Sequence, residues 1–255
     1  MIILLILLII ALLIAGCIWV GFHTSQTKKL VYNYEQQITD LQDLAWRAQM
    51  NPHFLNNCLN NINAVIHKLD RDTASSYLTC LSRLMRKILE HSDESKITLA
   101  QELDVISHYI KLEKLRFGDD MIITVSVEET LQIDKVCVPP LFIQPFLENA
   151  ILHGILPKNE AGNIEIRLCT LGPEILCCTI TDDGVGRSKL EKPIEAFPTG
   201  KRSMGMAITN KRISSFNKRN GKSLPVTVND LKDNNGLSTG TSIGIQLVLI
   251  SDNDD

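Results

Sequence analysis

The sequence predicts an α+β protein in which a membrane helix and a helical hairpin precede an α/β domain. Three observations predict this order. Residues Ile2–Phe22 carry no charge, residues from Val31 to Phe117 show helical periodicity, and strand-like alternation begins after Gly118. The resulting division is a membrane helix at 1–23, a coiled coil and helical hairpin at 24–117, an α/β domain at 118–251 and an acidic tail at 252–255.

Composition excludes some classes of protein and indicates the compartment. The chain has a net charge of -3 and no concentrated basic face, so we expect no binding to nucleic acid. Its seven cysteines are an odd number and include no CxxC pair or Cys/His metal spacing. They are therefore predicted to be reduced thiols in a cytosolic compartment.

The uncharged run is long enough to span a bilayer, because about twenty helical residues cross the roughly 30 Å hydrocarbon layer. A cleaved signal peptide is the nearest alternative. Cys17 also resembles a lipoprotein processing site, but the apolar stretch continues past it. Lys28 and Lys29 follow the run and no basic residue precedes it. The positive-inside bias therefore predicts a single-pass protein of the inner membrane with its C-terminal bulk in the cytoplasm.

A helical seam leads inward from the membrane. Apolar or small residues between Val31 and Ala48 recur at alternating spacings of three and four, as in a parallel coiled coil that joins two chains. A single amphipathic helix packed on its own domain is the alternative. Helical patterns follow at Ala74–Leu89 and at Leu99–Phe117, the second ended by Gly118. Helical hairpins from two chains would form a four-helix bundle.

Local patterns predict the elements of the α/β domain. They are a strand at Met121–Val127, a helix opened by Pro139-Pro140 and continuing through His153, paired strands at Ile164–Leu168 and Ile175–Ile180, a mobile polar loop at Arg187–Met204, a helix at Gly205–Asn217, and strands near Pro225–Val228 and Thr241–Leu249. This mixture of helices and strands is that of an α+β domain.

His53 is the first candidate for chemistry. It lies beside Pro52 in a run of amides and apolar residues, Gln49–Asn60. The proline removes a backbone donor and restricts the residue before it, so a local bend would expose the imidazole. Taken alone, the segment is equally compatible with an amphipathic helix whose histidine is packed or solvated.

Two downstream motifs have the residue types of a nucleotide site. Asn149 and His153 are four residues apart, which places them on one face of a helix, and an amide oxygen at Asn149 suits Mg²⁺. Asp182 can accept a hydrogen bond from the adenine amino group, while Gly184 and Gly186 let backbone approach a ligand. Each motif alone is also compatible with a plain turn or a capping amide. Their order and spacing favour the nucleotide site.

These motifs resemble those of the LytS-type sensor histidine kinases. The segment Asn51–Leu55, followed by Asn57-x-Leu59-Asn60, resembles the phosphoacceptor motif of that family, and Gln144–Gly154 resembles its N box. Asp182-x-Gly184-x-Gly186 resembles its first glycine box and Gly205–Ile213 its second. Gly240-Thr241 resembles the Gly-Thr pair that closes the family pattern. The resemblance covers nearly everything after the membrane helix. It implies a dimerisation and phosphoacceptor region followed by a GHKL-type α/β sandwich that binds ATP.

The resemblance also implies a role for each residue. In a homodimer, His53 would be autophosphorylated from ATP and Mg²⁺, and the phosphoryl group would pass to an aspartate of a cytoplasmic response regulator. Asn149 would hold Mg²⁺, and the loop at 187–204 would close over the nucleotide. The nucleotide would contact Asn149, His153, Asp182, Gly184, Gly186, Gly205 and Thr241.

The sequence departs from the family pattern in three places. Leu152 stands where family members often carry a phosphate-binding lysine, and Lys201 or Arg202 could supply that charge. Phe54 follows the histidine in place of an acid, so Glu148 is the candidate general base. Only one residue precedes the apolar run, so no extracytoplasmic sensor is expected. Two other functions stay open: a catalytically weak nucleotide-binding signalling scaffold, and a GHKL ATPase that releases phosphate to water.

Overall fold

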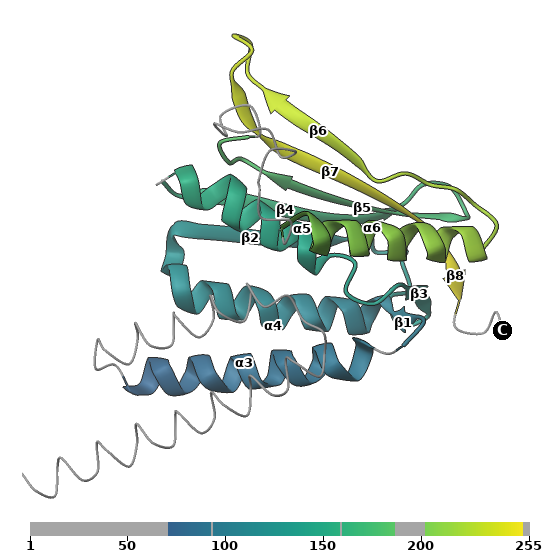
Figure 1. Cartoon of the computed structure of the whole chain (residues 1–255), viewed down its shortest axis with the longest axis horizontal. Helices are drawn as coiled ribbons and strands as arrows, with labels where there is room; N and C mark the ends of the chain where they lie inside the picture. The colour runs from purple at the N-terminus through teal and green to yellow at the C-terminus, as the bar shows by residue number, and fades with distance from the viewer. Residues whose placement is uncertain (1–70, 93, 159, 187–201, 252–255) are drawn as a thin grey trace, which may run out of the picture. The chain divides into compact units, whose positions relative to one another are not determined.

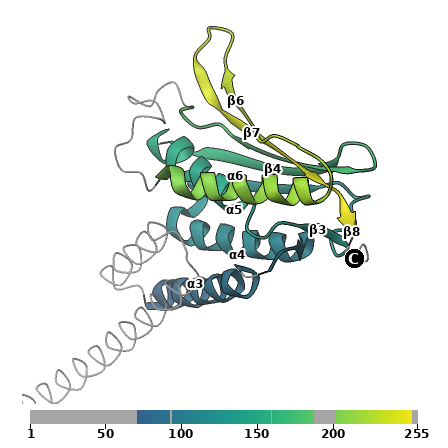
Figure 2. The ribbon, with the colours of Figure 1, turned by 45° about the vertical axis from the view of Figure 1, so that its right-hand side comes forward.

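The computed structural model describes residues 71–92, 94–158, 160–186 and 202–251. These all belong to one compact unit of the chain, residues 56–255. The predicted membrane helix, the coiled-coil seam, His53 and the acidic tail lie outside the described residues. Within the described part, no helix combines the length and apolar character needed to cross a membrane. The predicted α+β class is confirmed by the helices and strands of Figures 1 and 2.

Two long helices begin the described chain. They are α3 (Arg71–Ser92) and α4 (Leu99–Phe117), which pack against each other. Each has buried leucines, including Leu84 in α3 and Leu112 in α4. The Cys80 thiol also donates to the His108 carbonyl oxygen at 3.5 Å across the pair. The predicted bounds of α4 are confirmed, whereas α3 extends beyond the predicted range at both ends.

Helix α4 begins and ends at local sequence signals. Thr98 Oγ1 accepts a hydrogen bond from Gln101 N at 3.2 Å, and Gln101 Oε1 accepts one from Thr98 N at 2.8 Å, which forms a capping box. Gly118 follows the helix with a φ of 66°, a conformation that glycine adopts at little cost. A short 3₁₀ turn, η1 (Gly118–Asp120), then leads into the first long strand. The start of α4 places Glu102 in the first turn, where its side chain is fully buried.

A five-stranded mixed sheet is the scaffold of the α/β domain. In spatial order its strands are β2 (Met121–Val127), β4 (Gly162–Thr170), β5 (Ile175–Asp182), β7 (Ser238–Val248) and β6 (Thr227–Lys232). β2 runs parallel to β4, and the other neighbouring pairs are antiparallel. The predicted pairing of the strands at 164–168 and 175–180, which are β4 and β5, is confirmed, since Ile166 lies opposite Ile180. Buried residues alternate along β4 and β5, so one face of the sheet is covered.

A second, three-stranded sheet joins distant parts of the chain, and the sequence patterns do not predict it. Its strands are β1 (Ile97–Thr98), β3 (Val136–Val138) and β8 (Ile250–Ser251), in the order β1-β3-β8. Strands of two or three residues are too short to show a period-two pattern. Through this sheet the start of α4 is attached to the α/β domain.

Two helical segments cover the buried face of the large sheet (Figures 1 and 2). The first is α5 (Gln144–Asn149), which continues as a π-helical turn, η2 (Ala150–Ile155), and a 3₁₀ turn, η3 (Leu156–Lys158). The second is α6 (Arg202–Arg219). η2 contacts β4, β5 and β7, while α6 contacts β7 and α5.

The predicted start of the first segment is wrong. The helix begins at Gln144 and not at Pro139-Pro140, because Leu141 has a φ of 57° and the Leu141 and Ile143 N–H groups donate to Glu102. The helical path also continues beyond His153, through η2 and η3 to Lys158.

Two later boundaries are also corrected. Helix α6 begins at Arg202 and not at Gly205, so residues 202–204 do not belong to the predicted loop, whose other residues lie outside the described chain. The strand expected from Pro225 begins at Thr227 and extends to Lys232. Proline has no N–H group for a ladder of strand hydrogen bonds, which accounts for the later start.

Candidate functional site

Asp182 is the last residue of β5, which is the central strand of the large sheet. Ile164 lies opposite it on β4 and Thr241 lies opposite it on β7. Only 5% of the residue is exposed, and Oδ1 accepts a hydrogen bond from Gly184 N at 3.0 Å. Burial raises the pKa of this carboxyl to about 6, although hydrogen bonds from the Gly184 and Thr241 N–H groups act to lower it. At neutral pH it is mainly ionised and can accept further hydrogen bonds.

The turn after β5 lies directly against the helical segment. A Cβ atom added to Gly184 would be 2.3 Å from the carbonyl carbon of Gly154, and one added to Gly154 would be 2.6 Å from Asp182 Oδ1. The Val185 N–H donates to the Gly154 carbonyl oxygen at 3.0 Å. Since neither glycine has room for a side chain, the turn and the helical segment meet backbone to backbone. The Asp182 carboxylate lies at their junction.

Strand β7 lies against the backbone of Asp182 and the turn that follows it at two further glycine positions. Gly240 has a φ of 143°, and a Cβ atom there would be 1.9 Å from the Asp182 carbonyl oxygen. Gly186 has a φ of 66°, and a Cβ atom there would be 1.7 Å from Ser238 Oγ. Both positions therefore favour glycine by conformation and by space. Segments near residues 154, 184 and 240, far apart in the chain, come together at Asp182.

The predicted N-box residues lie on the helical segment that contacts β5. Asn149 ends α5 and is partly exposed, and its Nδ2 donates to the Pro145 carbonyl oxygen at 2.7 Å. That bond uses the amide nitrogen, so the amide oxygen is the atom with which Asn149 would bind a cation. Glu148 and His153 are also partly exposed. The expectation of one continuous α-helix through His153 is wrong, because the path widens into the π-turn η2, a feature frequent at functional sites.

The other predicted residues are not all brought to this junction. Thr241 is buried opposite Asp182, whereas Gly205 lies within α6 and Arg202 is the first residue of that helix. His53 and Lys201 lie outside the described residues. Across the described ranges, no three His, Cys, Asp or Glu residues gather as they would in an all-protein metal site.

Gly154 and Gly240 are residues of the site to which the sequence patterns assign no separate role. For Gly154 a signal exists, because glycine in a helical pattern costs about 1 kcal/mol relative to alanine and indicates close backbone approach. For Gly240 the reason is its positive φ and its contact with Asp182, both of which depend on the pairing of β5 with β7.

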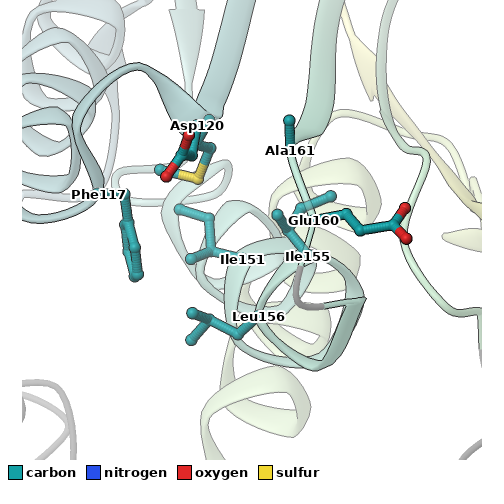
Figure 3. A pocket seen from close by; sticks show the side chains of 8 residues that line it. Phe117, Asp120, Ile151, Ile155, Leu156, Glu160 and Ala161 are labelled. Atoms are coloured by element: carbon teal, nitrogen blue, oxygen red, sulfur yellow. The ribbon is translucent and has the colours of Figure 1, made fainter.

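Two cavities of about 330 Å³ lie near this junction. Figure 3 shows the first, where Ile151, Ile155 and Leu156 lie between Phe117 and Glu160. It contains none of the predicted site residues. The second is lined by Asp182 and Asp183 together with exposed strand residues of the face that the helices do not cover, such as Thr124 and Glu165. Since the Asp182 carboxylate contacts Gly154 on the helical side, we assign the predicted nucleotide site to neither cavity.

The protein thus has an α/β domain in which the Asp182 carboxylate lies among three backbone segments. Comparisons with known proteins identify the class of protein to which this domain belongs. The family model for histidine kinase matches residues 41–121. The sensor histidine kinase YpdA of Escherichia coli strain K12 is 34% identical over 170 residues, which are 66% of this chain and 29% of YpdA. The sensor histidine kinase BtsS of the same strain is 32% identical over 187 residues, 72% of this chain and 31% of BtsS.

A third relative specifies the type. The sensor protein LytS of Streptococcus agalactiae is 32% identical over 144 residues, which are 56% of this chain and 24% of LytS. The chain belongs to the LytS-type histidine kinase family, which confirms the resemblance found in its motifs. The chain spans less than a third of the length of each of these three relatives, between 24% and 31%.

Proposed function

We propose that the protein is a membrane-anchored sensor histidine kinase that transfers the γ-phosphoryl group of ATP to His53 and then to an aspartate of a response regulator. It acts as a homodimer, with one membrane pass and its catalytic part in the cytoplasm. The observation that carries the proposal is the junction at Asp182, where a buried carboxylate lies among glycines that leave no room for side chains. Family membership supports His53 as the acceptor.

The junction fits a nucleotide in its chemistry. The ionised Asp182 has acceptor positions beyond the one that Gly184 N uses, and adenine offers an amino group as donor. Thr241, paired with Asp182, and the glycine turn at 184–186 form the adjoining backbone. His153 and Gly205 complete the proposed contacts from η2 and α6.

Asn149 is the proposed Mg²⁺ ligand. Its amide nitrogen is held by the Pro145 carbonyl oxygen, which orients the side chain. In the described chain no cluster of three acids, histidines or cysteines is available, so the other ligands would be water and phosphate oxygens, as Mg²⁺ commonly prefers. When bound, Mg²⁺ supplies charge neutralisation at the phosphates.

The chain itself has little covalent chemistry to perform. The lone pair of His53 Nε2 forms the bond to the γ-phosphorus, the bond from phosphorus to the bridging oxygen breaks, and its electrons leave with ADP. Placing the imidazole in line is the main contribution of the protein. Glu148, adjacent to Asn149 and partly exposed, is the candidate to accept the remaining imidazole proton.

Incubation of the full chain with γ-labelled ATP and Mg²⁺ tests the function. We expect acid-labile label on the wild type and none on His53→Ala, because the acceptor nitrogen is gone. His108→Ala, which removes a partly exposed histidine on α4, is the control and should be labelled like the wild type. Nucleotide binding without label would favour the signalling scaffold instead. Phosphate released to water without labelled protein would favour the ATPase.

A further inference from the structure

Glu102 on α4 is a fully buried carboxylate far in sequence from the nucleotide site. Its Oε2 accepts a hydrogen bond from Leu141 N at 2.7 Å, and its Oε1 accepts one from Ile143 N at 2.9 Å. Both oxygens are thus used on one short piece of backbone. Burying a carboxylate is unfavourable unless hydrogen bonds satisfy it. The contribution of Glu102 to the structure is therefore its two backbone hydrogen bonds and not apolar packing.

The backbone that Glu102 binds is the start of the helix that carries Asn149. Residues 141–143 immediately precede Gln144, where α5 begins. Leu141 has a φ of 57°, and among the described residues it is the one non-glycine with a positive φ. Such a conformation is strained for leucine and persists where surrounding contacts hold it. The Glu102 hydrogen bond to Leu141 N is one such contact.

A second helix holds the same segment. Arg212 of α6 donates from Nη1 to the Pro140 carbonyl oxygen at 2.8 Å. Burial raises the pKa of Glu102 to about 7, and the backbone N–H groups of residues 141–143 and the charge of Arg212 act to lower it. The segment before α5 is therefore held by a carboxylate from α4 and a guanidinium from α6.

We propose that Glu102 is a positioning residue for the nucleotide site: it holds residues 141–143 in the conformation from which α5 starts and so sets the place of Asn149. This rests on the proposed function, in which Asn149 binds Mg²⁺. Glu102 acts through the backbone and not by touching the nucleotide. Because α4 also packs on α3, the same carboxylate links the helical region to the site.

The test is the Mg²⁺-dependent part of nucleotide affinity in Glu102→Gln. Glutamine keeps the size of the side chain but replaces one acceptor oxygen with an NH₂ donor. One of the two hydrogen bonds from Leu141 N and Ile143 N is therefore lost. The Kd of the full chain for a fluorescent ATP analogue is measured with Mg²⁺ and with EDTA. We expect the gain in affinity from Mg²⁺ to fall about tenfold, the equivalent of one charged hydrogen bond, while the Kd in EDTA changes by less than about twofold.

Glu113→Gln is the matched control, since Glu113 is a second buried acid on α4, with 4% exposed. A merely structural loss of a buried carboxyl would affect both variants alike. The inference is overturned if Glu113→Gln lowers the Mg²⁺ gain as much, or if Glu102→Gln leaves that gain unchanged. A wild type that binds no nucleotide would instead overturn the proposed function.

Rescue by glycine separates positioning from general damage. Leu141→Gly in the Glu102→Gln background should restore part of the Mg²⁺ gain, because glycine adopts a φ near 57° without strain. A double variant no better than Glu102→Gln would count against the proposed strain. Should Glu102→Gln fail to fold, Glu102→Asp, which keeps the charge on a shorter side chain, is compared with Glu113→Asp by the same ratio and with the same criteria.

Discussion

Asp182→Asn is expected to weaken nucleotide binding by roughly 100-fold, because it turns an acceptor for the adenine amino group into a donor. Asparagine keeps the shape of the side chain and an oxygen for the Gly184 N–H group. The second carboxylate oxygen becomes an NH₂ group that would face another donor. Loss of a charged hydrogen bond together with an unsatisfied donor costs about 3 kcal/mol. Calorimetric titration with ADP and Mg²⁺ measures the change.

The same substitution should not destabilise the domain above pH 6. Burial raises the pKa of Asp182 to about 6 from 3.8, so the folded state binds this proton more tightly than the unfolded state does. Its contribution to the free energy of unfolding is therefore fully present below pH 3.8 and is lost as the pH rises through 6. At pH 8 the ionised group costs about 3 kcal/mol, which Asp182→Asn removes. Urea unfolding at pH 5 and pH 8 should show the larger relative gain at pH 8.

Asp183→Asn is the matched control, with the opposite pattern. Although burial acts to raise the pKa of Asp183, hydrogen bonds from Asn163 at 2.8 and 2.7 Å and the Lys158 ammonium at 3.4 Å outweigh it and lower the pKa. This carboxylate stabilises the fold above its ordinary pKa, and that contribution is lost as the pH falls through the lowered value. Asp183→Asn should therefore lose stability at pH 8 and keep its nucleotide affinity. If Asp182→Asn and Asp183→Asn bind ADP with the same affinity, Asp182 is not part of the nucleotide site.

Gly240→Ala is expected to lower the free energy of unfolding by more than about 3 kcal/mol, through backbone strain and a steric clash together. Residues other than glycine rarely adopt a φ of 143°. A Cβ atom would also lie 1.9 Å from the Asp182 carbonyl oxygen, and this backbone atom cannot move away by a side-chain rotation. Relief would require β5 and β7 to separate where they pair at Asp182 and Thr241. Urea unfolding followed by circular dichroism measures the loss.

Gly236→Ala separates the two causes. Gly236 also has a positive φ, of 80°, but a Cβ atom there would meet no atom within 4 Å. It should therefore show strain alone, about 1 to 2 kcal/mol. If both variants lose the same stability, the close approach of Gly240 to the Asp182 carbonyl oxygen does not contribute to the loss in Gly240→Ala.

Local signals predict local structure in this chain. Helix α4 has its predicted bounds because the Thr98 capping box and Gly118 lie within a few residues of its ends. Strand β2 likewise has its predicted bounds, Met121–Val127. The start of α5 could not be predicted in this way, because its determinant is Glu102, 39 residues from Leu141 in the chain. The small sheet of β1, β3 and β8 is similarly defined by partners distant in sequence.

By itself the sequence determined the α+β class, the family, the carboxylate at Asp182 and the glycines that accompany it, because residue types and their short-range spacing are sufficient for these. Only the tertiary structure decided that Gly154 lies against that carboxylate, that Gly240 lies against the backbone carbonyl of Asp182, and that Glu102 holds the start of α5. The physical reason is that steric exclusion and the loss of solvent around a charge arise between segments remote in the chain, and no local pattern contains them.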